Sequence, residues 1–274
     1  MRVVVLAPIV SSPFALAVTG LCLREPGVEV AGILVLRHWN VARLRRELRR
    51  DGARLLRKVW QKLVLRGGPE AGGPERSFHD VADELELGTR SLAGLARRHH
   101  IPYRAVPDHN HPGAVAWLRE RAPHVVAFTG GGLVRRPLLE AAGRGILNAH
   151  MGLLPAYRGM DVVEWPILEG RHASVGLGVT LHFMDPGIDT GPVVAVRRVP
   201  IRPGDGIERL RTRFEPVMVE AMLDGIRGLR DGALCATPQE RAAGRQYFAL
   251  HPRLQERVRA RLAALGAGDP HSPV

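Results

Sequence analysis

Residues 146–159 of the chain read ILNAHMGLLPAYRG, and residues 179–192 read VTLHFMDPGIDTGP. Each stretch begins as a short apolar strand and then becomes polar, with Asn148 and His150 in the first and Asp189 within a Gly- and Pro-rich turn in the second. Polar side chains that follow neighbouring strands meet at one edge of an α/β sheet, where such proteins assemble their reaction centres. We therefore expect an amide, an imidazole and a carboxylate to lie together.

Strands and helices alternate on the N-terminal side of these two stretches. Ser12 and Pro13 are typical of a helix start, and the apolar run at residues 2–7 predicts a buried strand before that helix. The further predicted elements are a helix at 13–24, a strand at 28–36, a helix at 89–99, a strand at 101–106, a helix at 110–121, a strand at 125–129 and a helix at 136–142. This alternation predicts an α/β fold with a doubly wound, mostly parallel sheet. No G-x-G-x-x-G motif follows the first strand, so the dinucleotide-binding fingerprint is absent.

The order of elements changes after the first of the two stretches. Residues 175–184 and 193–199 predict a pair of antiparallel strands joined by the turn that carries Asp189. The rest of the chain reads as two helices connected by loops. We expect residues 1–204 to form the catalytic domain and residues 205–274 to form a helical C-terminal extension packed on the same domain.

The formal net charge of +12 is concentrated in one segment. Residues 37–66 contain eleven Lys and Arg residues against two acids, so this segment alone carries +9. Between Val41 and Leu63 the apolar residues recur at three-, four- or seven-residue steps, which predicts amphipathic helices. A Gly-rich run follows and extends to Pro74. We therefore expect residues 37–74 to be a basic helical insertion in an otherwise near-neutral body.

The composition excludes several classes of protein. Cys22 and Cys235 are the two cysteines of the chain, too few and too far apart for a disulfide framework or a zinc site. No run of about 18 apolar residues predicts a membrane span, and the first apolar run is too short for a signal peptide. We expect a cytoplasmic protein without a bound metal. In the sequence His109-Asn110-His111, helix capping by Asn110 is preferred to a metal site.

Taken without any relatives, the three polar residues suit one kind of reaction. Asn148 and His150 are two residues apart, so in an extended strand their side chains point to the same side. A carboxamide beside an imidazole can stabilise a developing oxyanion. Asp189 can keep the imidazole protonated or take a proton through a water molecule. No Ser or Cys stands in a nucleophile-elbow context, so direct attack on a carbonyl is favoured over a covalent intermediate.

Each polar residue also has a simpler interpretation. Asn148 alone could be a turn residue, and His150 alone could be a hydrogen-bonded core histidine, but their combined spacing with Asp189 favours a reaction centre. His182 either reaches this centre or fills space in the core. Asp185 is expected to fix the acidic turn.

The ordered motifs of both stretches resemble the formyltransferase family that uses 10-formyltetrahydrofolate, which includes glycinamide ribonucleotide, methionyl-tRNA and amino-sugar formyltransferases. The matching residues are Asn148, His150, Leu153, Leu154, Pro155, Tyr157, Arg158, Gly159, Gly178, Val179, Thr180, His182, Asp185 and the run from Gly187 to Pro192. The similarity is good over about residues 100–200. The resemblance implies a Rossmann-like fold and a catalytic set of Asn148, His150 and Asp189.

The resemblance also implies sites for both substrates. The folate pocket would be formed by the loop at residues 129–134 and the turn at residues 184–189, chiefly through backbone groups. Its residues would be Gly132, Leu133, Val134, Met184, Asp185 and Gly187. The amine acceptor would be bound by Tyr157, Arg158, Asp161 and Glu164.

Departures from the family's pattern lie beside the implied acceptor site. Gly152 stands where relatives commonly have Ser in His-x-Ser-Leu-Leu-Pro, and residues 160–165 read MDVVEW in place of a run such as Ala-Ala-Pro. Asp161 and Glu164 could bind a cationic group of an unusual acceptor, or they could simply begin the next helix. The Gly-rich phosphate loop of a glycinamide ribonucleotide enzyme is missing after the first strand, since residues 8–13 contain no glycine.

We expect an N-formyltransferase that moves the formyl group of 10-formyltetrahydrofolate to the amine of a small acceptor, such as an amino sugar or a specialised-metabolite amine. Direct attack would give a tetrahedral intermediate whose oxyanion is stabilised by Asn148 and protonated His150, while Asp189 raises the pKa of His150. One alternative is hydrolysis of the formyl-folate. Another is a methionyl-tRNA-type formyltransferase, or an RNA-binding protein, that uses the basic segment.

The sequence of the basic segment does not identify a single binding partner. Residues 41–66 contain a single aromatic residue for base stacking, Trp60, so nucleic acid is a less favoured partner. The apolar stripe of the segment could dock on the body of the protein, on a second subunit in a homodimer, or on a membrane surface. A solvated basic face is the default interpretation.

Overall fold

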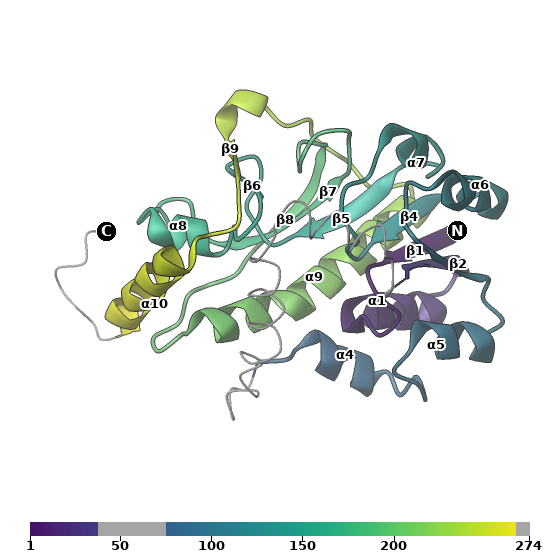
Figure 1. The fold of residues 1–274 in the computed structure, drawn as a ribbon, viewed down its shortest axis with the longest axis horizontal. Helices are drawn as coiled ribbons and strands as arrows, with labels where there is room; N and C mark the ends of the chain where they lie inside the picture. Colours follow the sequence, from purple (N-terminus) through teal and green to yellow (C-terminus); the bar gives the residue numbers. More distant parts are fainter. Residues whose placement is uncertain (38–74, 267–274) are drawn as a thin grey trace.

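The computed structural model describes residues 1–37 and 75–266, so all but the first residue of the expected basic insertion lies outside the described residues. The described chain forms a seven-stranded sheet with helices on both faces (Figure 1). The strand order is β3-β2-β1-β4-β5-β7-β8. These strands are β1 (Arg2–Ala7), β2 (Glu29–Leu36), β3 (Tyr103–Val106), β4 (Val125–Phe128), β5 (Ile146–His150), β7 (Gly178–Phe183) and β8 (Val193–Arg198).

Most neighbouring strands of this sheet run parallel. The pairs β2–β3, β1–β2, β1–β4 and β4–β5 are parallel, whereas β7 is antiparallel to both β5 and β8. The order reverses beside β1, where β2 lies on one side and β4 on the other. These pairings confirm the predicted doubly wound, mostly parallel sheet and the antiparallel strand pair near its end.

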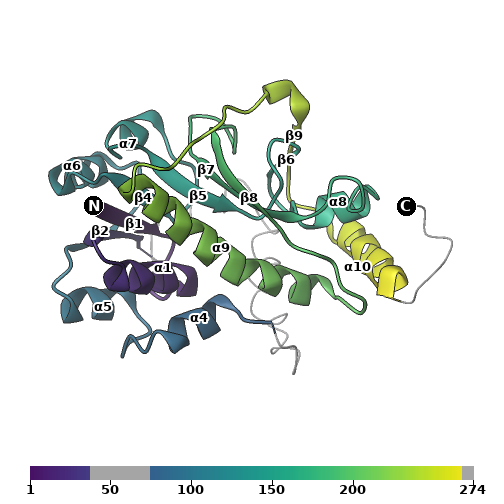
Figure 2. The same ribbon diagram turned by 180° about the vertical axis from the view of Figure 1, so that it is seen from behind.

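Two apolar cores cover the two faces of the sheet. On one face, alternate residues of β1 and β2 pack against α1 (Pro13–Arg24), α5 (Leu92–Arg98) and α9 (Ile207–Arg230). On the other face, the intervening residues pack against α6 (Pro112–Arg121) and α7 (Arg136–Glu140). Figure 2 shows α1 and α9 together on the first face. Alternating burial of both faces is what a parallel sheet between helical layers requires.

Local capping explains where two of the helices begin. Ser12 caps α1 as expected, because its Oγ accepts a hydrogen bond from the Ala15 N–H at 3.3 Å. For α6 the expected cap is wrong: the Nδ1 atom of His111, and not Asn110, accepts the hydrogen bond from Gly113 at 3.1 Å. The side chain of Asn110 is instead bonded to the glycine loop after β4, as described below.

The C-terminal part of the chain returns to the sheet. The long helix α9 packs against β5, β7 and β8, as Figure 1 shows. The chain then forms β9 (Arg245–Tyr247), which pairs in parallel with the short strand β6 (Tyr157–Gly159), and α10 (Pro252–Gly266), which packs against α8 (Glu164–Leu168). Strands β6 and β9 were not predicted. The division between residues 204 and 205 stays a prediction.

A buried ion-pair network holds Glu75 against α9. Arg213 on α9 donates hydrogen bonds to Glu75 at 2.7 Å and to both carboxylate oxygens of Asp205 at 2.7 Å. All three side chains are largely buried. The next helix, α4 (Phe78–Glu84), begins with a capping box formed by Ser77 and Asp80. No helix within residues 1–37 and 75–266 is long and apolar enough to cross a membrane.

Candidate active site

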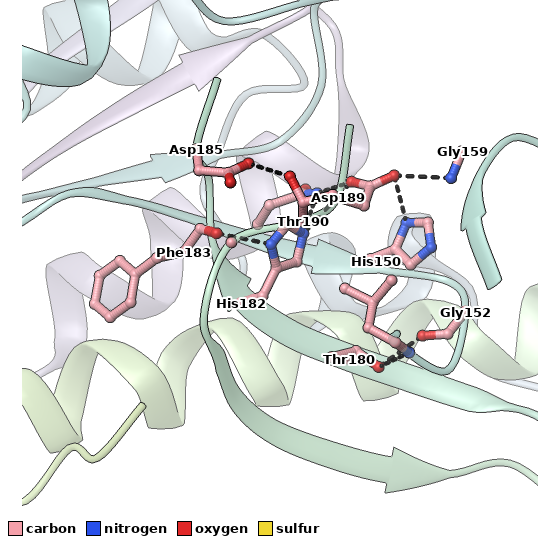
Figure 3. Close-up of polar contacts among 12 residues, drawn as sticks. His150, Gly152, Gly159, Thr180, His182, Phe183, Asp185, Asp189 and Thr190 are labelled. Carbon is pink, nitrogen blue, oxygen red and sulfur yellow. Dashed lines mark hydrogen bonds and ion pairs between the residues drawn. The ribbon is translucent and has the colours of Figure 1, made fainter. Parts of the chain in front are cut away.

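The polar centre lies where β5 and β7 meet near one edge of the sheet. Asn148 and His150 lie on β5, and in the antiparallel register they face His182 and Thr180 of β7. Residues that face each other across two strands point to the same side of the sheet. The turn after β7 folds back over this side and brings Asp189 against both imidazoles (Figure 3). The structure therefore brings the three predicted residues together and adds His182.

The carboxylate of Asp189 contacts every member of the centre. Its Oδ2 atom accepts a hydrogen bond from the Gly159 N–H at 2.9 Å and lies 3.6 Å from Nδ1 of His150. Its Oδ1 atom lies 3.5 Å from both Nε2 of His182 and Nδ2 of Asn148. The backbone of Asp189 has a positive φ of 52°, which non-glycine residues adopt only when their surroundings hold them there.

Hydrogen bonding defines the state of His182. Its Nδ1 atom lies 2.8 Å from the carbonyl oxygen of Phe183, which can only accept, so Nδ1 carries the proton. Its Nε2 atom then accepts a hydrogen bond from Nδ2 of Asn148 at 3.1 Å. These two contacts fix the orientation of the His182 ring and of the Asn148 amide. His182 is thus part of the centre, which answers the question that the sequence left open.

The ring of His150 has one protonated and one free nitrogen. Its Nε2 atom lies 2.9 Å from the carbonyl oxygen of Tyr157 and donates to it. The free Nδ1 atom therefore faces Asp189. Burial lowers the pKa of His150 below its ordinary value, although Asp189 and the Tyr157 carbonyl act in the opposite direction. We expected Asp189 to keep His150 protonated, but burial is the larger effect and leaves the ring neutral near pH 7.

Asp189 stays ionised over the physiological range. Burial raises the pKa of this carboxyl, but its contacts with His182 and His150 and the hydrogen bond from the Gly159 N–H outweigh burial and hold the pKa at about 2. A neutral imidazole with a free nitrogen therefore faces a fixed carboxylate. This pair can accept one proton at Nδ1 of His150 and stabilise the resulting imidazolium.

Residues 97–226 match the formyl transferase domain family. This match covers 130 of the 274 residues of the chain. It supports the resemblance to formyltransferases that the motifs around Asn148, His150 and Asp189 indicate.

Individual relatives differ in how much of this chain they match. A methionyl-tRNA formyltransferase from Trichlorobacter lovleyi is 33% identical over 147 residues, which are 53% of this chain and 46% of the relative. The chain thus spans about half the length of the curated relatives that it matches. A phosphoribosylglycinamide formyltransferase structure from Bacillus halodurans shares the fold with a TM-score of 0.51 and 24% identity, over 82% of this chain and 95% of that chain. A sugar 3N-formyl transferase, WlaRD, solved in the presence of dTDP and 5-N-formyl-THF, has a TM-score of 0.56 and 15% identity over 96% and 79% of the two chains.

Each of the two segments that the formyltransferase resemblance assigns to folate contributes a residue to the same apolar core. Val134 is buried in the core beneath α6 and α7, and Met184 packs against the same core. Glycines 130–132 all have positive φ. A Cβ at Gly131 would lie 2.5 Å from the His109 ring, whereas a Cβ at Gly132 would meet no atom within 4 Å, so the open space lies beside Gly132. Leu133 is 64% exposed. An exposed backbone at these two residues fits a ligand bound chiefly through main-chain groups.

Polar side chains fix the shape of both segments. Asn110 donates to the Leu133 carbonyl at 2.8 Å and accepts from the Arg135 N–H at 2.7 Å, so it ties down the end of the glycine loop. Asp185 accepts hydrogen bonds from the Gly187 N–H at 3.0 Å and from Thr190 Oγ1 at 2.7 Å. Asp185 therefore fixes the acidic turn, as expected, and Gly187 contributes its backbone N–H to that turn.

The residues expected to bind the acceptor are already engaged by the protein. Tyr157 is fully buried and donates its hydroxyl to Glu169 at 2.8 Å. Arg158 is 7% exposed and donates to the carbonyls of Pro155 and Gly244. These contacts favour a supporting role for both side chains in holding β6 against β9.

The two acids of residues 160–165 are paired with one arginine. Arg211 on α9 contacts Glu164 through two hydrogen bonds of 2.7 and 2.8 Å and Asp161 through one of 3.2 Å. Asp161 also accepts from the Leu250 N–H at 2.8 Å, and Glu164 lies in the first turn of α8. The contacts favour the structural interpretation of these acids over binding of a cationic acceptor. The exposed large apolar side chains nearby are Met160 and Phe248.

Gly152 has a steric role that the sequence did not reveal. A Cβ at this position would lie 2.7 Å from Nε2 of His150 and 2.8 Å from the carbonyl oxygen of Tyr157. The absence of a side chain therefore allows these two atoms to form their hydrogen bond. Thr180 holds the same segment, since its hydroxyl donates to the Gly152 carbonyl at 2.7 Å and accepts from Leu154.

One residue of the centre was missed entirely from the sequence. Gln239 donates through its amide nitrogen to the carbonyls of Asp189 at 3.0 Å and Gly191 at 2.6 Å. It lies in an irregular segment after α9, where no periodicity or motif indicates a partner 50 residues away. Within residues 1–37 and 75–266, no group of three or more His, Cys, Asp or Glu side chains is arranged to hold a metal ion.

Proposed function

We propose that this chain transfers the formyl group of 10-formyltetrahydrofolate to the amine of a small acceptor. The observation that carries the proposal is the contact of Asp189 with Asn148, His150 and His182 beside the neighbouring strands β5 and β7. Asn148, His150 and His182 lie in the sequence between the glycine loop after β4 and the acidic turn after β7. Asp189 lies in that turn, and both segments suit folate. The WlaRD structure, solved with a formyl-folate, supports the choice of co-substrate.

Formyl transfer requires a bond change and a proton transfer. The amine nitrogen forms a bond to the formyl carbon, the bond from that carbon to N10 of the folate breaks, and the proton lost by the amine replaces the formyl group on N10. Negative charge develops on the formyl oxygen during attack. Preorganised N–H donors that face this oxygen are the chief means of stabilising such a charge.

The residues of the centre divide this work. The 3.5 Å contact from Asn148 to Asp189 is long, so the N–H of Asn148 on this side can donate to the formyl oxygen without the loss of a strong hydrogen bond. Nδ1 of His150 accepts the amine proton, and Asp189 stabilises the imidazolium that results. His182 keeps the Asn148 amide in the required orientation. The same imidazolium can return the proton to N10.

The acceptor is proposed to be an amino sugar or a comparable small amine. The sugar 3N-formyl transferase aligned over 96% of this chain supports this choice. A second candidate is the amino group of methionyl-tRNA, which is favoured by the curated relatives of that name and by the +9 charge of residues 37–66. Hydrolysis, with water as the acceptor, is the third outcome that the same chemistry permits.

One assay separates these activities. The protein is incubated with 10-formyltetrahydrofolate and with dTDP-amino sugars, free amino sugars, methionyl-tRNA or no acceptor, and both the tetrahydrofolate and the acceptor mass are followed. Folate product that forms only with an amino sugar, together with a formylated sugar, supports the proposal. Product with methionyl-tRNA alone supports the second candidate, and equal product without acceptor supports hydrolysis. No product under any condition would contradict formyl transfer to these acceptors.

A further inference from the structure

The turn that carries Asp189 is held in place by a part of the chain that lies outside the formyl transferase domain match. That match ends at residue 226. After α9 the chain runs back along the edge of the sheet, where Thr237 forms a pair of backbone hydrogen bonds with Val193, both 2.8 Å. This pairing fixes the backbone two residues before Gln239 and aims its side chain at the turn.

The amide of Gln239 is matched to this turn. Its nitrogen donates to the carbonyls of Asp189 and Gly191. Both partners can only accept hydrogen bonds, so the nitrogen and not the oxygen of the amide must face them. A carboxylate or an apolar side chain at this position could not make either bond. The two bonds bracket Thr190 and thereby hold the backbone of Asp189 at its positive φ.

The carboxylate of Asp189 has a second attachment, which the C-terminal region supports indirectly. Gly159 of β6 donates to it, and β6 is held by parallel pairing with β9. The position of this carboxylate relative to His150 therefore depends on two contacts, one from the Gln239 side chain and one from β6. The first contact and the strand that holds β6 both lie after residue 230.

From these contacts we infer that Gln239 is a positioning residue for Asp189. It sets the distance and direction of the carboxylate toward Nδ1 of His150, and it acts through Asp189 without touching the substrates. The inference rests on the proposed function only in that Asp189 serves formyl transfer. The geometric part of it can be tested without turnover.

The test uses Gln239→Met, which has a similar length but no N–H donor, and Gln246→Met as a matched control. Gln246 is exposed on β9, in the same C-terminal region. The pH titration of the His150 ring is followed by NMR, with the signal assigned by its loss in His150→Gln. The groups that face this ring are Asp189 and His182. A misplaced carboxylate raises the pKa of the imidazole less, so the His150 pKa should shift downward in Gln239→Met and not in Gln246→Met.

A double variant distinguishes positioning from a general structural effect. In an Asp189→Asn background the carboxylate charge is gone, so adding Gln239→Met should move the His150 titration no further. In the formyl-transfer assay Gln239→Met should lower kcat by about 10-fold or more with little change in KM, since small misplacements of reacting groups are costly. If Gln239→Met does not fold, as judged by circular dichroism, Gln239→Leu provides a second uncharged variant that also lacks the donors.

Three results would overturn the inference. One is a His150 pKa in a folded Gln239 variant that equals the wild-type value. Another is an equal shift in Gln246→Met, and the third is a further shift in the Asp189→Asn background. Failure of the wild-type protein to transfer formyl groups would contradict the proposed function alone, because the NMR titration would still report on the positioning of Asp189.

Discussion

The amide of Asn148 makes two contacts in the centre. Its nitrogen lies 3.1 Å from Nε2 of His182 and on a longer contact of 3.5 Å to Asp189. A donor that is already oriented needs no reorganisation when charge develops on a substrate oxygen. This explains why an amide, and not a charged side chain, suits a position between an imidazole and a carboxylate.

Asn148→Ala removes this donor and should reduce kcat by about 10²–10³-fold, the usual loss for one oxyanion donor. The KM for 10-formyltetrahydrofolate should change little, because the folate is proposed to bind through the glycine loop and the acidic turn. Steady-state kinetics with the acceptor found in the assay above measure both constants. Asn148→Asp keeps the size of the side chain but lacks the donor, so it should lower kcat as Asn148→Ala does. A change in KM alone would contradict the assignment of Asn148 as the oxyanion donor.

The neutral state of His150 predicts a specific pH dependence. Burial lowers the pKa of His150 below the ordinary 6.5, so kcat/KM should fall only when the pH drops below this lowered value and the ring becomes protonated. Asp189→Asn removes the charge that raises the pKa, so the acidic limb should move to still lower pH while the plateau rate falls. pH–rate profiles of both proteins give the direction of the shift, and an upward shift would contradict the proposed role of Asp189.

Among the elements, the loop from β6 to α8 is fastened to α9 by Arg211. The side chain of Glu164 is 7% exposed, and burial raises its pKa in opposition to the charge of Arg211. Removing the partner of a buried carboxylate lowers the free energy of unfolding by several kcal/mol in dry sites. The loss is smaller where water reaches the pair. Arg211 is itself 37% exposed, so the smaller effect applies here.

Arg211→Met should therefore lower the free energy of unfolding by about 2 kcal/mol. Urea denaturation at pH 7 measures this value. Adding Glu164→Gln removes the unpaired charge and should restore part of the loss, so the double variant should be more stable than Arg211→Met alone. Equal stability of the single variant and wild type would show that the pair contributes nothing.

Prediction from sequence worked for elements whose signals are local. Ser12 begins α1 as expected because its hydroxyl caps a helix within the next three residues, and Asn148 and His150 share a side because they are two residues apart on one strand. It failed where the partner is distant. Asn110 binds the backbone at residues 133–135 instead of capping α6, and β9 pairs with β6 although neither has an apolar run.

At the scale of the whole molecule, Arg213 on α9 connects two parts of the chain that are far apart in the sequence. It binds Asp205 in the loop just before α9, and it also binds Glu75. Its hydrogen bonds lower the pKa of Glu75, and they outweigh the burial that raises the pKa of Asp205, so that pKa is lowered as well. Carboxyl groups with lowered pKa values in the folded state stabilise it above their unfolded values of about 4, and this contribution is lost as the pH falls through the folded values.

Arg213→Met should reduce the free energy of unfolding by about 3 kcal/mol at pH 7, because it leaves two largely buried carboxylates unpaired. The difference from wild type should shrink as the pH is lowered below about 4, because the carboxyl groups of the unfolded chain become neutral there, and those of the folded wild type become neutral at their lowered pKa values. Urea denaturation at both pH values checks this, with Arg257→Met on the exposed side of α10 as the control. A difference that does not depend on pH would rule out the ionic explanation.

The attachment of Asp189 by late segments has a consequence for the order in which the protein is made. Every strand of the seven-stranded sheet is complete by Arg198, so that sheet can begin to form while the chain is still being synthesised. Gln239 and β9 emerge from the ribosome afterwards. The newly made sheet therefore passes through a stage in which the acidic turn and Gly159 are present, but neither Gln239 nor the strand that holds β6 has been made. Catalytic competence should appear as the last step of maturation, separately from the folding of the sheet.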